Sequence, residues 1–266
     1  MNLLRRSMRA VATAVVAGSL GAAAQAAFVP GEDLVNPGLT GNTQHDAWVG
    51  LTSANYPGFP GFPGTGAWPH PMAPNQPGSG DGELIKLANG TGGGPYPTSG
   101  GIYFGGFSGD INNLGGTLAV KDATPVADFK NVVFQVQIGE AWTYDFYNHA
   151  LPTLSYNGGS QNLAATTSLV LSKFDNGTVT MPTGDETVYI NTYLLQWDLS
   201  GISSPITDFS IQFSGTQHSQ LYALQLDQSD VYKAYGTVVP EPSTILMTAS
   251  GVLPLALLTL RKRHLA

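Results

Sequence analysis

The chain has 266 residues, no cysteine and a formal charge of −7 at pH 7. Without cysteine it has no disulfides, thiolate metal sites or cysteine nucleophiles. Its five arginines all lie within the first nine or the last six positions, so residues 27–238 carry five lysines against 17 acidic residues, a formal charge of −12. Phosphate and nucleic acid need cationic contacts. We therefore expect no nucleic-acid partner for this acidic body.

The first 26 residues are typical of a secretory signal peptide. Three arginines within the first nine positions form a positive region, and residues 10–23 form an apolar stretch of small side chains. Ala24 and Ala26 then supply an A-x-A cleavage site. We expect cleavage after Ala26 and export of the remaining chain.

Residues 55–82 form a Pro/Gly-rich segment, which we expect to be a loop or extended coil. A loop of this length is usually functional or disordered. Its aromatic side chains suggest a platform that stacks on sugar rings. The alternative is that the same rings fold back and cover a sheet edge or one end of the core. The residues concerned are Tyr56, Phe59, Phe62 and Trp68.

The rest of the body shows the period-two alternation of half-buried strands, without a sustained helical period. Asn-Gly at 176–177 predicts a hairpin turn. The pattern predicts one all-β domain over 27–238, an antiparallel two-sheet sandwich of jelly-roll kind, with a small closed barrel as the alternative. The predicted strands are 83–87, 101–107, 117–121, 131–138, 142–147, 167–174, 187–197, 208–213 and 221–227.

No catalytic site is predicted, and no cofactor is expected. The histidines lack the H-x-x-x-H or H-E-x-x-H spacing of zinc enzymes, and no G-x-S-x-G elbow stands at a strand-to-helix turn. Carboxylates on loops suit calcium, and Asp227 with Asp230 is a candidate pair. No D-x-D-x-D-G loop accompanies it. Glycoside hydrolysis requires two carboxylates that lie close together in space. With 17 acidic residues in the body, the sequence does not show which of them would form such a pair.

The last 28 residues, 239–266, combine three features in a fixed order. Pro240, Glu241 and Pro242 form an extended, accessible motif, because proline fits neither a helix interior nor a central strand. Residues 244–260 are uncharged, and as a helix they would extend about 25 Å, the short end of what crosses a bilayer. The basic cluster Arg261, Lys262 and Arg263 would stay on the cytoplasmic side. This tail predicts a C-terminal transmembrane helix.

The three-part tail resembles the PEP-CTERM sorting signal of exported proteins in Gram-negative bacteria. The resemblance implies that a membrane-embedded exosortase recognises Pro240, Glu241 and Pro242 and cuts nearby. It also implies transient membrane anchoring, delivery to the cell surface or outside the cell, and association with exopolysaccharide. The alternative is a permanent single-span anchor without processing.

We therefore expect a non-catalytic exported protein of the cell surface or extracellular matrix. Its expected partners are exosortase and the secretion machinery. The alternative functions are a carbohydrate-binding, lectin-like module and, with less support, a polysaccharide hydrolase or lyase.

Overall fold

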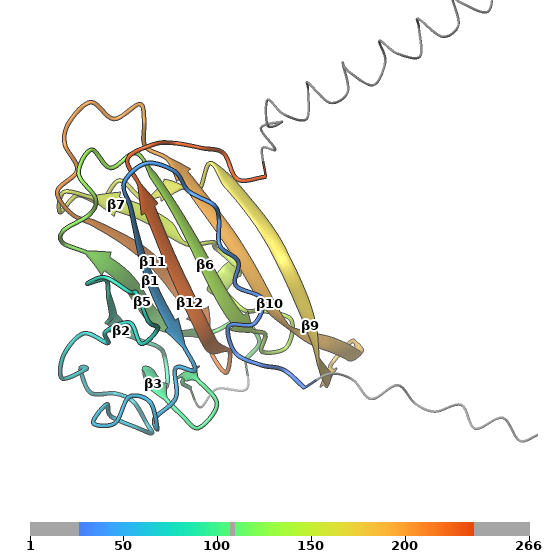
Figure 1. Cartoon of the computed structure of the whole chain (residues 1–266). Helices are drawn as coiled ribbons and strands as arrows, with labels where there is room; N and C mark the ends of the chain where they lie inside the picture. The colour runs from blue at the N-terminus through green and yellow to red at the C-terminus, as the bar shows by residue number, and fades with distance from the viewer. Residues whose placement is uncertain (1–26, 107–109, 237–266) are drawn as a thin grey trace, which may run out of the picture.

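The computed structural model describes residues 27–106 and 110–236. These residues form 12 strands and one 3₁₀ turn, η1 (Tyr147–His149), and the strands build two antiparallel sheets packed face to face (Figure 1). The prediction of an all-β, two-sheet sandwich is confirmed. No helix among these residues has the length and apolar character to cross a bilayer. The predicted signal peptide and C-terminal helix lie outside the described residues.

The larger sheet has seven strands in the order β3-β4-β12-β6-β10-β9, and β1 pairs with β12 beside this path. Long strands dominate it: β9 and β10 have 15 residues each and form a hairpin that extends past the end of β6 (Figure 1). The strands are β1 (Thr43–Val49), β3 (Pro95–Pro97), β4 (Ile102–Phe104), β6 (Asn131–Gly139), β9 (Thr167–Met181), β10 (Gly184–Asp198) and β12 (Gln220–Ser229).

The smaller sheet has five strands in the order β2-β5-β11-β7-β8. Its central strands alternate as predicted: Phe209, Ile211 and Phe213 of β11 face the core, whereas Ser210 and Gln212 face outward. The strands are β2 (Glu83–Asn89), β5 (Leu114–Asp122), β7 (Thr153–Tyr156), β8 (Leu163–Ala164) and β11 (Phe209–Thr216).

The core lies between the two sheets. Val132, Phe134, Val136 and Ile138 of β6 face it, as their alternation predicts, together with the fully buried Trp48. Burying large apolar side chains is the main stabilising contribution in a sandwich without disulfides.

The segment 27–42 crosses the outer face of the seven-stranded sheet before the chain enters β1 (Figure 1). We call it the strap. The Val35 amide donates to Gln135 Oε1 at 2.9 Å, and Gln135 Nε2 donates back to the Val35 carbonyl at 2.7 Å. The Gly31 amide donates to Gln137 Oε1 at 2.8 Å. The strap thus supplies hydrogen-bond partners to buried amide side chains of β6.

Two local predictions are wrong. Residues 142–147 form a tight loop and not a strand, because Trp142 and Thr143 adopt positive φ angles of 57° and 127°. Asn176-Gly177 is not the hairpin turn; β9 continues to Met181, and the register shift opposite Thr187 and Tyr189 makes this dipeptide a β-bulge.

Strict alternation along the predicted strand 221–227 places Tyr222 on the same face as Leu224 and Leu226, and this third local prediction is wrong. A register shift between Leu221 and Ala223 moves Tyr222 out of the alternation. Leu224 and Leu226 face the core as predicted, whereas Tyr222 packs on Phe28 of the strap, with ring centroids 4.7 Å apart.

Candidate functional site

A row of polar side chains crosses the outer face of the five-stranded sheet. Glu83 of β2 lies directly opposite Lys121 of β5, Lys121 lies opposite Ser210 of β11, and Ser210 lies opposite Ser155 of β7. Directly opposed residues of antiparallel strands point to the same face. Neighbouring strands are about 4.8 Å apart, so the row extends over about 14 Å.

This row forms part of the floor of a groove of about 850 Å³, which we call the sheet groove. The turn after β7 forms one rim and is tied to the start of β11. Asn157 donates from its side chain to the Pro205 carbonyl at 2.8 Å, and its Oδ1 accepts from the Thr207 amide at 2.8 Å. The backbone amide of Asn157 donates to the Asp208 carbonyl at 2.9 Å. The rim is therefore held by hydrogen bonds to the segment that leads into β11.

Two of the three carboxylates at the groove are engaged in the chain's own hydrogen bonds. Asp122 accepts from Gln228, Gln44 and the Thr124 amide. Asp208 accepts from the Gly158 amide at 3.1 Å, and its other oxygen accepts from the Thr207 hydroxyl at 3.3 Å. Glu83 is exposed and lies beside Lys121. The groove thus presents hydroxyl, amide, ammonium and carboxylate groups suited to hydrogen bonding.

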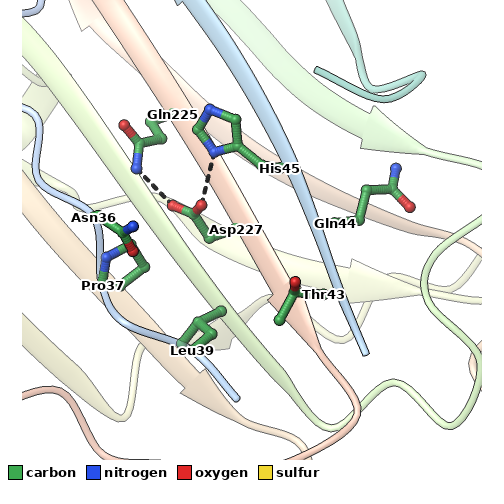
Figure 2. A pocket seen from close by; sticks show the side chains of 8 residues that line it. All are labelled: Asn36, Pro37, Leu39, Thr43, Gln44, His45, Gln225 and Asp227. Atoms are coloured by element: carbon green, nitrogen blue, oxygen red, sulfur yellow. Dashed lines mark hydrogen bonds and ion pairs between the residues drawn. The ribbon is translucent and has the colours of Figure 1, made fainter. Parts of the chain in front are cut away.

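A second concavity, of about 430 Å³, lies between the strap and the β1–β12 pair (Figure 2). His45 Nδ1 is 2.7 Å from Asp227 Oδ1, and Gln225 Nε2 donates to Asp227 Oδ2 at 2.7 Å. Asn36 and Leu39 line the strap side, and Gln44 points away from His45 (Figure 2).

The hydrogen bond to Asp227 raises the pKa of His45 above its usual value, against the opposing effect of partial burial. The carboxylates of Asp227 and Asp46 add attraction for the charged imidazole. Among the described residues, no hydroxyl group is hydrogen-bonded to His45, so the pair lacks the nucleophile of a catalytic triad. The hydrogen-bonded pair of His45 and Asp227 links β1 to β12.

The predicted calcium candidates are separated into two hydrogen-bonded groups. Asp227 binds His45 and Gln225 as described above, whereas Asp230 accepts from both the amide and the side chain of Asn42, at 2.9 and 2.7 Å. Within the described part of the chain, no three His, Asp or Glu side chains are grouped so as to hold a metal ion.

Three of the four aromatic residues predicted to stack on sugars form one cluster against the sandwich. Tyr56 is 8% exposed, and Phe59 makes edge contacts with Tyr56 and Trp68 at centroid distances of 6.2 and 5.3 Å. Trp68 Nε1 donates to the Pro95 carbonyl at 3.1 Å. Phe62 is 71% exposed. The clustered rings cover the core, which was the alternative expectation, and stacking of Phe62 on a sugar remains a prediction.

The groove residues Lys121, Ser155 and Ser210 were missed by sequence reasoning. Lys121 and Ser210 belong to predicted strands, but their pairing joins segments about 90 residues apart. Ser155 lies in β7, a short strand that was not predicted. The available signal was the outward position of polar residues in the alternating pattern of β5 and β11.

No protein-family model, curated protein or solved structure matches this chain. The residues of the predicted sorting motif, basic cluster and signal cleavage site lie outside the described residues.

Proposed function

We propose that this chain is a non-catalytic exported protein of the cell surface or extracellular matrix whose body binds a neutral polysaccharide along the sheet groove. The observation that carries the proposal is the polar row of Glu83, Lys121, Ser210 and Ser155 across four strands. An extended polymer with hydroxyl groups on both edges can hydrogen-bond to such a row.

The charge of the body favours a neutral ligand. Five lysines against 17 acidic residues leave residues 27–238 at −12, which repels polyanions such as uronic-acid polymers. The groove offers both a carboxylate and an ammonium, and a neutral sugar chain can use either. Since Asp122 and Asp208 are held in internal hydrogen bonds, the groove favours binding over the two-carboxylate chemistry of hydrolysis.

The ends of the chain support an exported location. The N-terminal segment has the composition of a signal peptide, and the tail has the order of a PEP-CTERM signal. We infer sorting by an exosortase at Pro240, Glu241 and Pro242, with the apolar helix and basic cluster as a transient membrane anchor. Delivery to a polysaccharide-rich matrix then places the groove beside its ligand.

Binding is tested with the full chain, purified in a detergent without a sugar headgroup, against dextran, mannan, β-glucan and alginate. We expect binding to at least one neutral polymer, none to alginate, and no release of reducing ends. Ser210→Tyr fills the middle of the row and should weaken binding by about tenfold or more. Ser168→Tyr, at an exposed position of β9, is the matched control and should bind as the unmodified chain.

Binding to no neutral polymer, or equal binding by Ser210→Tyr, would overturn the groove assignment. Release of reducing ends would instead support the hydrolase alternative.

A further inference from the structure

The loop 141–151, between β6 and β7, is an aromatic-rich segment with an unusual backbone. Four of its residues that are not glycine have positive φ: Trp142 (57°), Thr143 (127°), Asn148 (57°) and His149 (54°). Such conformations persist only where the surrounding structure holds them, and they concentrate at functional sites. We call this segment the aromatic loop.

Hydrogen bonds of the buried Asp145 anchor the aromatic loop to the sandwich. Asp145 is 4% exposed; its Oδ1 accepts from the Phe146 amide at 2.6 Å, and its Oδ2 accepts from Asn191 at 3.0 Å and the Tyr193 hydroxyl at 2.6 Å. The Asp145 carbonyl accepts from the Thr216 amide at 2.8 Å. The only carboxylate of the loop is thus buried and used for anchoring, which leaves its outer surface without negative charge.

The loop carries several rings and amides, of which His149 and Asn148 are exposed and Trp142 and Tyr144 are half-buried. Tyr144 and His149 stack with centroids 4.2 Å apart and planes 19° apart. The Trp142 ring meets His218 of the β11–β12 turn edge-on at 5.1 Å. Asn148 is exposed; its amide donates to Asn112 Oδ1 at 2.9 Å, and its own Oδ1 accepts from Asn112 Nδ2 at 2.9 Å.

We propose that the aromatic loop is a second saccharide-binding site, which makes the body bivalent for neutral polysaccharide. The ligand class rests on the proposed function. Rings flanked by amides match a sugar, whose C–H faces stack on the rings and whose hydroxyls bond to the amides. Preorganisation by the Asp145 anchor lowers the ordering cost of binding.

The position of the loop separates it from the sheet groove. Both contact β11, the groove through Ser210 and the loop through the bridge between Phe146 and Gly215. Ser210 and Gly215 are five positions apart along β11, so the two contact points lie about 17 Å apart. A body with two such sites joins two polymer segments, which is the property that a matrix protein needs.

The test uses Trp142→Gly combined with His149→Gly. Both positions have left-handed backbone, which glycine adopts without strain, so the rings are removed while the loop conformation is retained. The control is Leu169→Ala, which removes apolar surface at a 42% exposed position of β9. Calorimetry measures the stoichiometry for a hexasaccharide of the polymer that binds, and light scattering measures cross-linking of the polymer itself.

We expect two hexasaccharides per unmodified chain and per Leu169→Ala chain, and one for the double variant and for Ser210→Tyr. Both single-site proteins should lose polymer cross-linking. If the double variant melts lower than the unmodified chain, Trp142→Asn replaces it, because asparagine also tolerates positive φ.

A stoichiometry of one in the unmodified chain, or unchanged cross-linking in the loop variant, overturns this inference and leaves the groove proposal standing. Absence of binding to every neutral polymer defeats both.

Discussion

Asp46 illustrates how one residue can reduce the stability of this acidic fold. It is fully buried in β1, its Oδ1 accepts from the Gly82 amide at 3.2 Å, and its Oδ2 has no hydrogen-bond partner among the described residues. Burial raises the pKa of its carboxyl group, and the nearby carboxylates of Asp122 and Asp81 raise it further. An ionised Asp46 therefore carries a desolvation cost that its hydrogen bonding offsets only in part.

We predict that Asp46→Asn stabilises the protein at pH 7 by about 1 kcal/mol. A raised pKa in the folded state means that the unmodified chain keeps its full stability below the unfolded value of 3.8 and loses part of it as pH rises through the raised pKa. Asparagine carries no charge and so avoids this loss of stability at high pH. The stabilisation by Asp46→Asn should therefore vanish at low pH, where Asp46 is protonated in both states. Urea unfolding between pH 3 and pH 8 measures it.

The control is Glu186→Gln, an exposed residue of β10, which should change stability by less than about 0.5 kcal/mol. A destabilised Asp46→Asn protein at pH 7 would show that the charge itself is required.

At the scale of elements, hydrogen bonds hold the strap against the outer face of the seven-stranded sheet. Gln135 is fully buried and exchanges two hydrogen bonds with Val35. We predict that Gln135→Leu lowers the free energy of unfolding by about 2 kcal/mol, because it leaves the Val35 amide unpaired. The loosened strap should also be cut faster by protease within residues 27–42, as measured by mass spectrometry of timed digests.

Gln212→Leu, on the exposed side of β11, is the matched control for stability and should stay within about 0.5 kcal/mol. Equal protease resistance of the strap in both variants would mean that the remaining contacts, such as Gln137 with Gly31, are sufficient to hold it.

Strands with clean alternation were predictable, and the irregular positions were not. The outward and inward residues of β6 and β11 follow from period two alone, because each strand has one core face. The bulges at Asn176-Gly177 and Tyr222 depend on the partner strand, so a single segment does not reveal them. The left-handed backbone of Trp142 depends on the anchoring of the loop by Asp145, which is a tertiary interaction.

For the whole molecule, the sheet groove arises from pairings between distant parts of the chain. Glu83 and Ser155 belong to one groove only because β5 and β11 lie between their strands. The sequence shows the outward polar positions of β5 and β11, but it does not show which strands bring them together in one groove. By contrast, the proposed targeting segments are local: the predicted signal peptide and the predicted sorting tail are each contiguous in sequence, so their prediction needs no knowledge of the fold.

The described body ends at Gly236, shortly before the predicted sorting motif. The described body is anchored close to its end, because the Tyr235 amide donates to Gln196 Oε1 at 2.8 Å. The proposed sorting motif begins four residues after Gly236 in the sequence. In the sequence, the proposed motif therefore directly follows the described domain. We predict that intact-mass measurement of the mature protein shows a start at Ala27 and loss of the basic cluster Arg261, Lys262 and Arg263. Deleting the exosortase gene of the producing cell should restore the cluster. Retention of the cluster in both strains would establish the permanent anchor instead.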